Sequence, residues 1–374
     1  MNTKICHLTS VHFIDDVRIV KECTSLAANG FDVTLIACGD SAFEDMKNGV
    51  KRISLYVPVK NRLQRMIKRT KAVKQRAFQL NADIYHFHDP ELMPLGLKLK
   101  KRNKLVICDV HEDFPLNILT KDWIPCILRH FIAGIMRFYE QKIAVNFDAI
   151  VSVTPQIVER FKKINKNSFL ITNYPLLNDK SKMILEEKVS NTFCYAGTIE
   201  PLRMIHSIIQ AMELVPDARF LLAGEISNEY LDKLKKLPGW KNVIFLGLIP
   251  YQQVLSLYSK SAFGIVIENY HPVNYNNEGS LGITKLFEFM QAGLPVICSD
   301  FILYKEIVST YKCGITVNPT NIYEIVEAIN YLFKNPVEAK KMGENGQRAV
   351  RQKYNWTTQE KVLIAMYEKL SLGL

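Results

Sequence analysis

The chain alternates short apolar runs, rich in β-branched and aliphatic residues, with longer segments of helical character. In the first half, runs typical of buried strands lie at residues 4–10, 33–37, 51–57, 84–88, 104–111, 149–154 and 168–173. A second series lies at residues 193–197, 219–224, 243–247, 263–268, 295–299 and 314–317. Strands that alternate with helices in this way predict parallel sheets with crossover helices. We therefore expect an α/β protein with two doubly wound domains.

The two series are separated by a segment without this alternation. Residues 173–179 read Asn-Tyr-Pro-Leu-Leu-Asn-Asp, and residues 180–188 are strongly charged, so we expect a linker there. From about residue 336 to residue 370 the pattern is helical. The apolar stripe expected in its last part consists of Trp356, Val362, Leu363, Met366, Tyr367 and Leu370.

Length and composition agree with this organisation. A chain of 374 residues can hold two domains with a core each, and 48% hydrophobic residues are typical of a globular protein. No apolar run approaches the roughly 18 residues of a membrane span, and the chain enters its first strand at Lys4 without the pattern of a signal peptide. The eight cysteines show neither CxxC nor zinc-type spacing. These features predict a cytoplasmic protein with buried thiols.

The formal charge of +11 is unevenly distributed. Residues 60–76 contain no acidic residue and carry Lys60, Arg62, Arg65, Lys68, Arg69, Lys71, Lys74 and Arg76. Leu63, Met66, Ile67, Val73 and Ala77 recur there at roughly helical spacing, which predicts an amphipathic basic helix. Such a helix would bind an anionic membrane surface, with about 1 kcal/mol from each basic residue near it. A solvated helix is the alternative.

The charge also raises nucleic-acid binding as a separate class of function. No RNP, KH or helix-turn-helix signature accompanies the basic residues, and aromatic residues do not interleave with the basic run. We therefore expect no nucleic-acid partner.

The most informative segment is an expected amphipathic helix that Gly282 opens and that carries Lys285 and Glu288, followed by a Gly-Leu-Pro turn at residues 293–295. The start of a helix attracts phosphate through its free amides and its dipole. Glu288 could accept hydrogen bonds from sugar hydroxyls, and Lys285 could offset the charge of a diphosphate. This order predicts a nucleotide-sugar site. Alternatively, both charged residues lie on the solvated face of a core helix whose buried residues are Leu286, Phe287, Phe289 and Met290.

Polar residues follow several predicted strands, at the position where open α/β sheets bind ligands. They are His88, Asp89, His111, Glu112, Gly197 and Thr198, with Arg203 a few residues further on. No GxGxxG or GxxxxGK[ST] motif follows a strand, which argues against a dinucleotide oxidoreductase and a P-loop NTPase.

Each histidine at these strand ends also has a structural interpretation. His111 could be a hydrogen-bonded histidine at the end of its strand, and His88 with Asp89 could form a local turn before Pro90. His86 should face the same side of its strand as His88 because side chains alternate along a strand.

The first helix carries its own group of charged residues. Asp15 or Asp16 is expected to cap the helix at its start. Arg18, Lys21 and Glu22 are expected to be charges on the helix surface.

Several short motifs occur along the chain in a fixed order. They are residues 16–19, 26–33, 86–92 and 109–112 in the first half, and residues 195–203, 222–224, 245–250 and 285–295 in the second. In this order and spacing, nearly the whole chain resembles the retaining glycosyltransferases of family 4. The resemblance implies the B-type glycosyltransferase fold (GT-B), in which two Rossmann-like domains face a central cleft.

The resemblance also implies a function for each part of the chain. Residues 1–175 would bind the acceptor, residues 189–354 would bind the nucleotide sugar, and a helix over residues 355–374 would cross back to pack on the first domain. The implied catalytic residues are His111, Arg203, Lys285 and Glu288. The implied donor-binding residues are Gly197, Thr198, Arg203, Gly224, Gly247, Leu248, Ile249, Ser280, Gly282, Lys285 and Glu288. The implied acceptor-binding residues are Asp15, Arg18, His88, Asp89 and Glu112.

The family pattern assigns a role to each catalytic position. Glu288 matches the glutamate that holds the ribose hydroxyls, and Arg203 and Lys285 match cations near the donor diphosphate, where negative charge develops. His111 matches a histidine near the reacting sugar, where it would be an orienting hydrogen-bond donor and not a base. Retention in this family is attributed to same-face attack guided by the leaving diphosphate. We therefore expect no protein nucleophile, no cofactor and no bound metal.

This chain departs from the family pattern at two positions. Ser280 stands eight residues before Glu288, where many relatives have a first glutamate, and Glu278 could take its place. Thr198 stands where some relatives have an arginine. Arg203 and Lys285 would therefore have to neutralise more of the phosphate charge. The identity of the donor is therefore not carried over.

The resulting expectation is a retaining transferase that moves a sugar from a nucleotide-sugar donor to a lipid-linked saccharide acceptor in the synthesis of a bacterial surface polysaccharide. It would be cytoplasmic, with peripheral binding to the inner face of the plasma membrane through residues 60–76. The alternative of the same fold is a nucleotide-sugar isomerase or epimerase that needs no acceptor.

Overall fold

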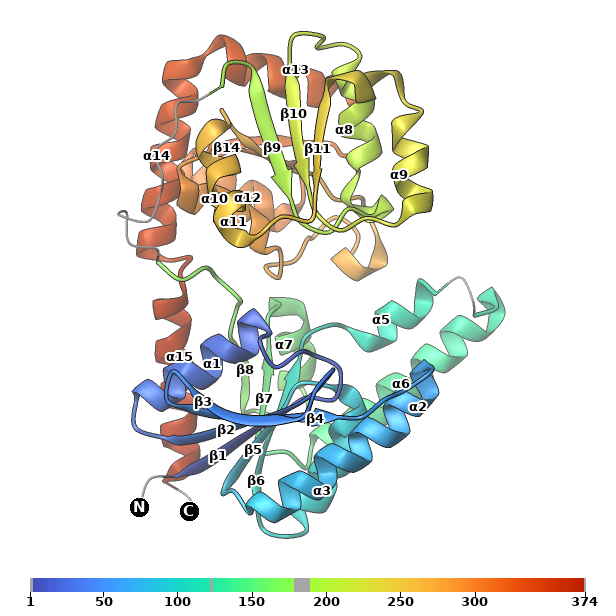
Figure 1. Ribbon diagram of the computed structural model, residues 1–374, viewed down its shortest axis with the longest axis vertical. Coiled ribbons are helices and arrows are strands. Elements are labelled where there is room, and N and C mark those ends of the chain that lie inside the picture. The colour runs from blue at the N-terminus through green and yellow to red at the C-terminus, as the bar shows by residue number, and fades with distance from the viewer. Residues whose placement is uncertain (1–2, 122–123, 178–188, 373–374) are drawn as a thin grey trace. The chain divides into compact units, whose positions relative to one another are not determined.

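The structure is a computed structural model that describes residues 3–121, 124–177 and 189–372 (Figure 1). The chain divides into two compact units. Unit 1 consists of Met1–Asn173 and Thr358–Leu374, and unit 2 of Tyr174–Thr357. Most of the expected linker, residues 178–188, lies outside the described residues.

Unit 1 is built on a sheet with the strand order β3-β4-β2-β1-β5-β6-β7-β8. The strands are β1 (Lys4–Leu8), β2 (Asp32–Gly39), β3 (Phe43–Lys47), β4 (Val50–Tyr56), β5 (Ile84–Phe87), β6 (Leu105–Val110), β7 (Ala149–Ser152) and β8 (Ser168–Leu170). All pairs are parallel except β3 with β4. Each run expected to form a strand does so, and the chain reverses its direction across the sheet between β1 and β5, which is where such sheets bind ligands.

Strand β3 was not expected from the sequence. Its five residues are all exposed and mix apolar with charged side chains, so the run lacks the apolar pattern of the other strands. It pairs antiparallel with β4 through a tight turn at Asn48 and Gly49, whose φ angles are 53° and 77°. An Asn-Gly pair is a strong hairpin signal, and it would have identified this edge strand.

The helices of unit 1 lie on both faces of the sheet, with α1 and α3 on opposite sides (Figure 1). They are α1 (Val17–Ala28), α2 (Arg62–Gln64), the π-helical turn η1 (Arg65–Arg69), α3 (Thr70–Leu80), the 3₁₀ turn η2 (Pro90–Leu92), α4 (Met93–Lys100), α5 (Phe114–Leu119), α6 (Cys126–Ala144), α7 (Pro155–Lys162) and α15 (Trp356–Ser371). None of the helices in the described ranges has both the length and the hydropathy that a membrane span requires.

The charged residues of α1 correct one expectation. Asp16 caps the helix as predicted, because its side chain accepts hydrogen bonds from the backbone N–H groups of Arg18 and Ile19. Arg18, Lys21 and Glu22, however, are not surface charges, since all three are buried. The physical reason for Arg18 is its ion pair with Asp109 inside unit 1, and the Arg18 guanidinium also contacts the Glu22 carboxyl group.

The basic segment forms the predicted helix, continuous from α2 through η1 to α3. Its apolar residues do not form one buried face. Val73 and Ala77 are fully buried, whereas Leu63, Met66 and Ile67 are exposed among the basic side chains. Only the second half of the segment is therefore held by the core.

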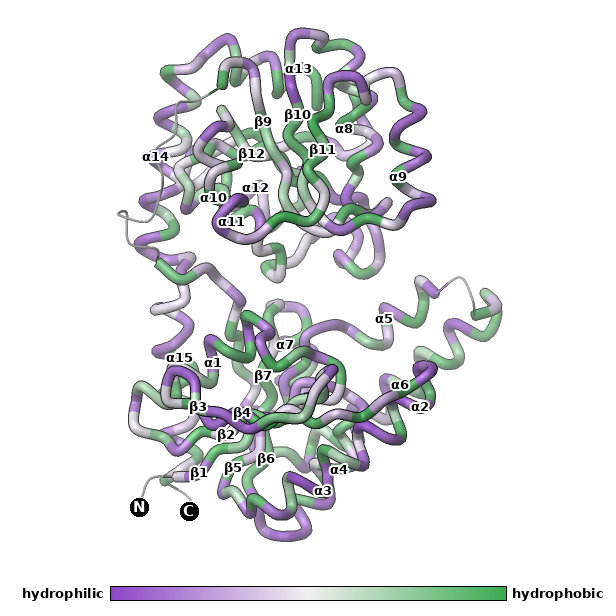
Figure 2. Tube along the Cα trace, viewed as in Figure 1, coloured by the Kyte–Doolittle hydropathy of each residue, from purple (hydrophilic) through white to green (hydrophobic). Residues whose placement is uncertain are grey.

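Unit 2 has a fully parallel sheet with the strand order β11-β10-β9-β12-β13-β14. The strands are β9 (Thr192–Ala196), β10 (Arg219–Ala223), β11 (Val243–Gly247), β12 (Gly264–Val266), β13 (Val296–Ser299) and β14 (Gly314–Val317). Figure 2 shows β10 and β11 as mostly hydrophobic along their length, although β11, at the edge of the sheet, leaves Ile244 and Leu246 exposed. At the centre of the core, the Phe193 ring stacks between those of Phe220 and Phe263, with centroid distances of 4.8 and 5.0 Å.

Five helices of unit 2 join consecutive strands, as the alternation predicts, namely α8 (Ile205–Met212), α9 (Asn228–Lys235), α10 (Tyr251–Lys260), α11 (Thr284–Ala292) and α12 (Ile302–Tyr311). Helices α13 (Ile322–Lys334) and α14 (Pro336–Gln352) follow the last strand, β14. Short 3₁₀ turns lie at η4 (Pro201–Arg203), η5 (Pro238–Asn242) and η6 (Pro272–Asn274).

The last helix, α15, begins in unit 2 and continues into unit 1, since the boundary between the units falls after Thr357. The backbone N–H of Trp356 donates to the Pro175 carbonyl at 2.8 Å within unit 2. Further along, Leu363, Met366 and Tyr367 are buried. Val362, expected in the same stripe, is 37% exposed because it lies on the outer side of the helix.

Candidate functional site

A cavity of about 220 Å³ lies in unit 2 at the carboxyl ends of β9 and β10. Six of the residues expected to bind the donor line it, namely Gly197, Thr198, Gly224, Leu248, Ile249 and Lys285. Glu225, Tyr251 and Val254 also line it and were not expected. Their position after β10 and at the start of α10 is the signal that could have identified them, because ligands of parallel sheets lie beyond the carboxyl ends of the strands.

Two glycines shape the floor of this cavity. A Cβ atom at Gly224, whose φ is +147°, would lie 1.7 Å from the Gly197 carbonyl oxygen. A Cβ atom at Gly197 would lie 3.1 Å from the Tyr195 hydroxyl and 3.2 Å from Lys285 Cε. The loops that follow β9 and β10 therefore touch through their backbones, and the Lys285 side chain runs directly over Gly197.

Helix α11 supplies Lys285 to the lining of the cavity, whereas Glu288 on the same helix lies behind Lys285 and outside the lining. Leu286, Phe287, Phe289 and Met290 are buried in the core. The Lys285 ammonium donates to Glu288 Oε2 at 2.9 Å, and the Tyr258 hydroxyl donates to the same oxygen at 2.9 Å. The Lys285 and Glu288 side chains are 26% and 17% exposed, so they do not lie on a fully solvated face. Gly282 was expected to open this helix, but the first helical residue is Thr284.

The structure places Arg203 beside an acid rather than in the lining of the cavity. Its guanidinium contacts the Glu268 carboxylate, and its Nε lies 3.4 Å from Glu200. Glu268 is buried at the end of β12 and accepts a second hydrogen bond, from the Tyr304 hydroxyl at 3.0 Å. The charge of Arg203 is therefore largely compensated within unit 2. Sequence reasoning missed Glu268, whose position as the last residue of the expected strand at residues 263–268 was a usable signal.

The remaining donor-binding predictions lie around the cavity rather than in its lining. The carbonyl of Gly247 accepts a hydrogen bond from the Gly224 N–H at 2.8 Å and so supports the cavity floor. Ser280 Oγ accepts from the Gly282 N–H at 3.1 Å, which shapes the loop before α11. Glu278 is exposed on the same loop.

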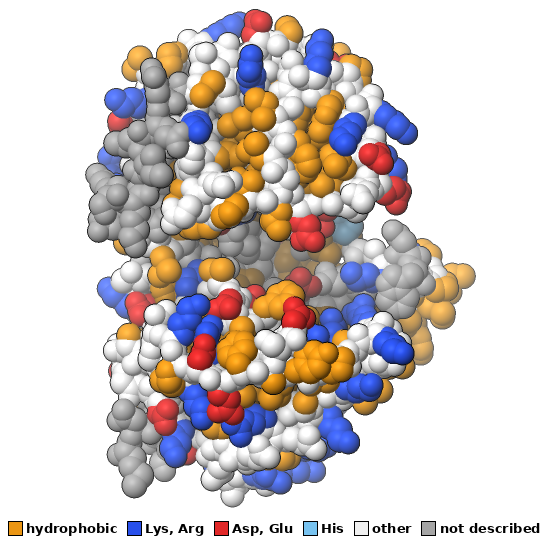
Figure 3. Space-filling model, in the orientation of Figure 1, with side chains coloured by type: hydrophobic (Ala, Val, Ile, Leu, Met, Phe, Trp, Pro, Cys, Tyr) orange, Lys and Arg blue, Asp and Glu red, His pale blue; other side chains and the backbone are white. Residues whose placement is uncertain are grey.

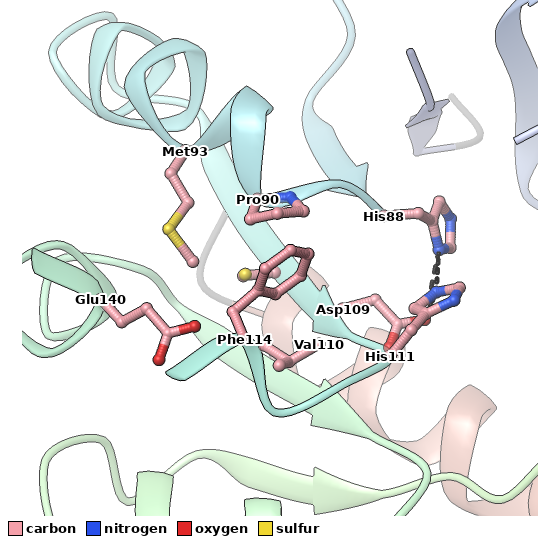
Figure 4. A pocket seen from close by; sticks show the side chains of 9 residues that line it. His88, Pro90, Met93, Asp109, Val110, His111, Phe114 and Glu140 are labelled. Atoms are coloured by element: carbon pink, nitrogen blue, oxygen red, sulfur yellow. Dashed lines mark hydrogen bonds and ion pairs between the residues drawn. The ribbon is translucent and has the colours of Figure 1, made fainter. Parts of the chain in front are cut away.

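A second polar cluster lies in unit 1, where His88 and His111 follow β5 and β6 and Asp109 lies near the end of β6. Figure 4 shows the two imidazoles facing each other with Asp109 beside them, next to a small cavity lined by Pro90, Met93 and Phe114. His88 Nδ1 and His111 Nε2 each lie 3.2 Å from Asp109 Oδ2. Arg18 donates to Asp109 from two nitrogens, the shortest contact being 2.7 Å.

Burial and pairing set the protonation of this cluster. Burial alone would favour the neutral acid, but Arg18, His111 and His88 hold the pKa of Asp109 well below its usual range. Burial lowers the pKa of His88, although Asp109 opposes the shift, and it lowers the pKa of His7 and His86 still further. Burial raises the pKa of Glu22 to about 8 against the pull of Arg18. The cluster thus combines one firmly ionised acid with three neutral histidines.

Two overlapping groups in unit 1 carry ligand atoms close enough to hold a metal ion, within 4.8 Å of one another. They are His7, Glu22, His86 and His88, and His88, Asp109 and His111. In the second group, Asp109 Oδ2 already accepts two hydrogen bonds from the Arg18 guanidinium. A metal ion at that oxygen would lie beside a buried cation, so the group of His88, Asp109 and His111 fits a metal poorly.

The expected acceptor-binding residues fall into two sets. Arg18, His88 and Asp89 are buried. Asp89 Oδ2 accepts from Thr9 Oγ1 at 2.8 Å and from the Ser10 N–H at 2.6 Å, which holds the loop after β1 in the way a structural turn residue would. Asp15 is exposed and pairs with Arg52 and Lys47. Glu112 accepts from Asn117 at 2.6 Å and lies beside the β6 end.

His12, which had no expected role, also belongs to this region. Its ring lies 4.9 Å from that of His111, centroid to centroid, and its Nδ1 lies 3.2 Å from Asp16. Burial disfavours its charged form, but Asp16 and Asp89 outweigh burial and raise the pKa of His12. Its place in the loop after β1 was the available signal.

Comparison with known proteins defines the class of the chain. Residues 178–349 match the family model described as glycosyl transferases group 1, and residues 17–171 match the model described as glycosyltransferase family 4. Sucrose-phosphate synthase from Thermosynechococcus elongatus has a similar structure, with a TM-score of 0.79 over 100% of both chains at 18% identity. The fold is therefore the two-domain GT-B fold of glycosyltransferases.

Curated relatives agree with this class. The D-rhamnosyltransferase WbpZ of Pseudomonas aeruginosa is 23% identical over 282 residues, which are 74% of this chain and 71% of that protein. The MMP α-(1→4)-mannosyltransferase of Mycolicibacterium hassiacum is 28% identical over 83 residues, 22% of this chain and 20% of its own length. Several curated relatives are matched over less than half of their length. The two family models together cover most of the chain, which belongs to glycosyltransferase family 4.

Proposed function

We propose that this protein transfers a sugar from a nucleotide-sugar donor to a saccharide acceptor. The observation that carries the proposal is the arrangement of Lys285 and Glu288 in unit 2. Lys285 lines a cavity at the carboxyl ends of β9 and β10 whose floor is backbone, and its ammonium contacts the Glu288 carboxylate of the same helix. This combination suits a ligand with a diphosphate and vicinal hydroxyls.

The donor groups can be assigned to particular side chains. Lys285 would contact the diphosphate and stabilise the negative charge that develops as the sugar leaves. Glu288, held in place by Tyr258, would accept hydrogen bonds from the ribose hydroxyls. Because Arg203 is paired with Glu268, it would act through that ion pair, and Lys285 would be the principal cation.

We further propose that the transfer retains the configuration of the anomeric carbon and requires no metal ion. The poor fit of the unit 1 cluster to a metal supports the second part. Proton NMR of the product with an α-linked donor would show an α-anomeric signal, and activity should persist in EDTA. A β-anomeric product, or loss of activity that Mg²⁺ or Mn²⁺ restores, would contradict the respective part.

The acceptor is proposed to be a lipid-linked saccharide of bacterial surface polysaccharide synthesis. The likeness to the D-rhamnosyltransferase WbpZ supports this class of acceptor. In unit 1, Asp15 and Glu112 are the exposed residues of the expected acceptor site. Together with the part-buried His111, which was expected to be catalytic, they would lie nearest to the acceptor.

We propose that unit 1 binds the inner face of the plasma membrane. Exposed Leu63, Met66 and Ile67 lie among basic residues in α2 and η1. Helix α6 adds a second exposed apolar set, consisting of Ile127, Leu128, Phe131, Ile135, Phe138 and Tyr139. In Figure 3, hydrophobic and basic side chains are interspersed over the part of unit 1 that carries α2. Apolar side chains beside cations are suited to an anionic lipid surface.

Two experiments test the central proposal. A thermal-shift screen with nucleoside diphosphates and nucleotide sugars should reveal one preferred base, since a ligand at 100 times its Kd adds roughly 2.7 kcal/mol to the free energy of unfolding. Product analysis with donor alone then separates transfer from isomerisation. Conversion of the donor to an isomer in the absence of an acceptor would favour a nucleotide-sugar isomerase or epimerase instead.

A further inference from the structure

The cluster around Asp109 is one end of a continuous chain of hydrogen bonds through the interior of unit 1. His88 Nδ1 lies 3.2 Å from Asp109 Oδ2, and His88 Nε2 lies 3.0 Å from His7 Nδ1. His7 Nε2 lies 3.2 Å from the Tyr367 hydroxyl, which lies 2.8 Å from His86 Nδ1. All five side chains are buried, so each ring nitrogen depends on these partners for its hydrogen bonds.

The donor and acceptor at each hydrogen bond of this series follow from the ionised carboxylate of Asp109 at its end. An ionised carboxylate can only accept hydrogen bonds, so His88 must carry its proton on Nδ1. A neutral His88 then accepts at Nε2 from His7 Nδ1–H, and His7 accepts at Nε2 from the Tyr367 O–H. Tyr367 remains a donor because burial raises its pKa well above the usual range. Its oxygen in turn accepts from His86 Nδ1–H, which fixes the proton position on every ring.

The opposite direction is electrostatically unfavourable. It would place the lone pair of His88 Nδ1 3.2 Å from the charged Asp109 oxygen. When the hydrogen bonds run toward Asp109, only one ring nitrogen of the series lacks a partner. This is His86 Nε2, whose lone pair lies 4.0 Å from Asp109 Oδ2. The charge-assisted bond from His88 to Asp109 therefore decides the direction.

The same argument applies to His111, the histidine at the end of β6. Its Nε2 lies 3.2 Å from Asp109 Oδ2 and 3.2 Å from His88 Nδ1. His88 Nδ1 already carries a proton, and a bond to the charged carboxylate is stronger than one between two imidazoles, so the arrangement favours a proton on His111 Nε2 that is donated to Asp109. The Nε2–H tautomer has a bare lone pair on Nδ1. Its side chain is 18% exposed, so this part of unit 1 is accessible to a ligand. His111 in this state offers an acceptor at Nδ1, which differs from the donor role that the family resemblance implies.

We propose that Asp109 is a positioning residue that holds His111 in the Nε2–H tautomer, so that Nδ1 of His111 accepts a hydrogen bond from a sugar hydroxyl. The role of the sugar rests on the proposed function. The chain through His88, His7 and Tyr367 holds Asp109 from the interior, together with Arg18. His111 thereby becomes an acceptor whose orientation is set by a buried carboxylate, as in other acid–histidine pairs.

The direct test is the proton position on the ring nitrogens. Long-range ¹H–¹⁵N spectra of protein labelled with ¹⁵N-histidine distinguish nitrogens with and without a proton, and single His→Gln variants assign the signals. His111 should be protonated at Nε2 and bare at Nδ1, whereas His7, His86 and His88 should be protonated at Nδ1. A proton on His111 Nδ1, or a shift of His88 and His111 signals on adding one equivalent of Zn²⁺, would overturn the proposal.

Kinetics test the consequence for transfer. Asp109→Asn should lower kcat by about 10- to 100-fold through misplacement of His111, with nucleotide affinity unchanged because the donor cavity is in unit 2. The control Asp148→Asn removes another acid of unit 1 that is paired with a lysine, Lys100, and should leave kcat within about threefold. Unchanged kcat in a folded Asp109→Asn protein would overturn the positioning role.

A second pair of variants remains informative if Asp109→Asn does not fold. Asn and Gln place an amide oxygen near the positions of His Nδ1 and Nε2, respectively. His111→Asn should therefore keep more of kcat than His111→Gln, and the reverse order would contradict the proposal. If no donor supports transfer by the wild type, the proposed function fails, but the tautomers are still measured independently by NMR.

Discussion

Lys285 Nζ lies 2.9 Å from Glu288 Oε2, less than one turn further along α11. Each charge satisfies the other, which limits the cost of keeping both partly buried. A nucleotide sugar offers each of them a better partner, since phosphate suits the ammonium and hydroxyls suit the carboxylate. The pair can therefore separate when the donor binds, without leaving an uncompensated charge.

Tyr258 should matter for donor binding although it does not line the cavity. Its hydroxyl donates to Glu288 Oε2 at 2.9 Å and so orients the carboxylate. Tyr258→Phe should raise the KM for the donor by roughly 2- to 10-fold, the worth of one hydrogen bond, with little change in kcat. Steady-state kinetics with varied donor measure this. The control Tyr323→Phe changes a tyrosine that is 72% exposed, and an equal rise in its KM would argue against the role of Tyr258.

Gly224 should not tolerate a side chain. Gly224→Ala would force a Cβ atom to 1.7 Å from the Gly197 carbonyl at a φ of +147°, so we expect a loss of at least about 3 kcal/mol in the free energy of unfolding. The control Gly134→Ala lies in α6 with no atom within 4 Å of the new Cβ, and it should stabilise by about 0.5–1 kcal/mol. Urea unfolding measures both, and a Gly224→Ala protein as stable as wild type would show that the two loops do not touch.

Glu22 should make stability depend on pH. Its pKa is raised to about 8 from 4.5, so the folded state keeps the proton that the unfolded state has already lost. This contribution is complete below pH 4.5 and is lost as the pH rises to about 8. Glu22→Gln should therefore lose less stability than wild type between pH 5 and 8. Urea unfolding at several pH values measures the difference, and parallel pH curves for the two proteins would contradict it.

Binding to anionic membranes should depend on three exposed basic residues, Arg62, Lys68 and Lys71. Reversal of these charges to Glu should reduce cosedimentation with vesicles that contain phosphatidylserine by at least 10-fold, since each basic residue contributes about 1 kcal/mol. Reversal of Lys334, Lys340 and Lys341 in unit 2 changes the net charge equally and serves as the control. Equal loss in both variants would indicate a response to net charge alone.

The sequence was sufficient for the buried strands because short apolar runs between helical segments are typical of parallel sheets covered on both faces. It missed β3, whose exposed residues carry no such pattern and whose position depends on the Asn48–Gly49 turn. The burial of Arg18 and Glu22 could not be read locally either. Asp109, the partner of Arg18, lies 91 residues further along the chain, and only the fold brings these two charges together.

In the candidate site, too, some features could be predicted from the sequence and others depend on the fold. The loops after β9 and β10 and the helix with Lys285 were identifiable because each follows or precedes a strand. The pairing of Arg203 with Glu268 and of Glu288 with Tyr258 depends on side-chain packing between elements. Helical or strand spacing carries no information about such contacts.

The most direct test of the central claim is calorimetric titration of wild type, Lys285→Met and Glu288→Ala with the preferred nucleoside diphosphate, with Glu306→Ala on the exposed side of α12 as the control. Both α11 variants should bind at least about 10-fold more weakly, which corresponds to about 1.4 kcal/mol each, and the control should bind like wild type. Wild-type affinity in both α11 variants would show that the nucleotide does not bind at this cavity.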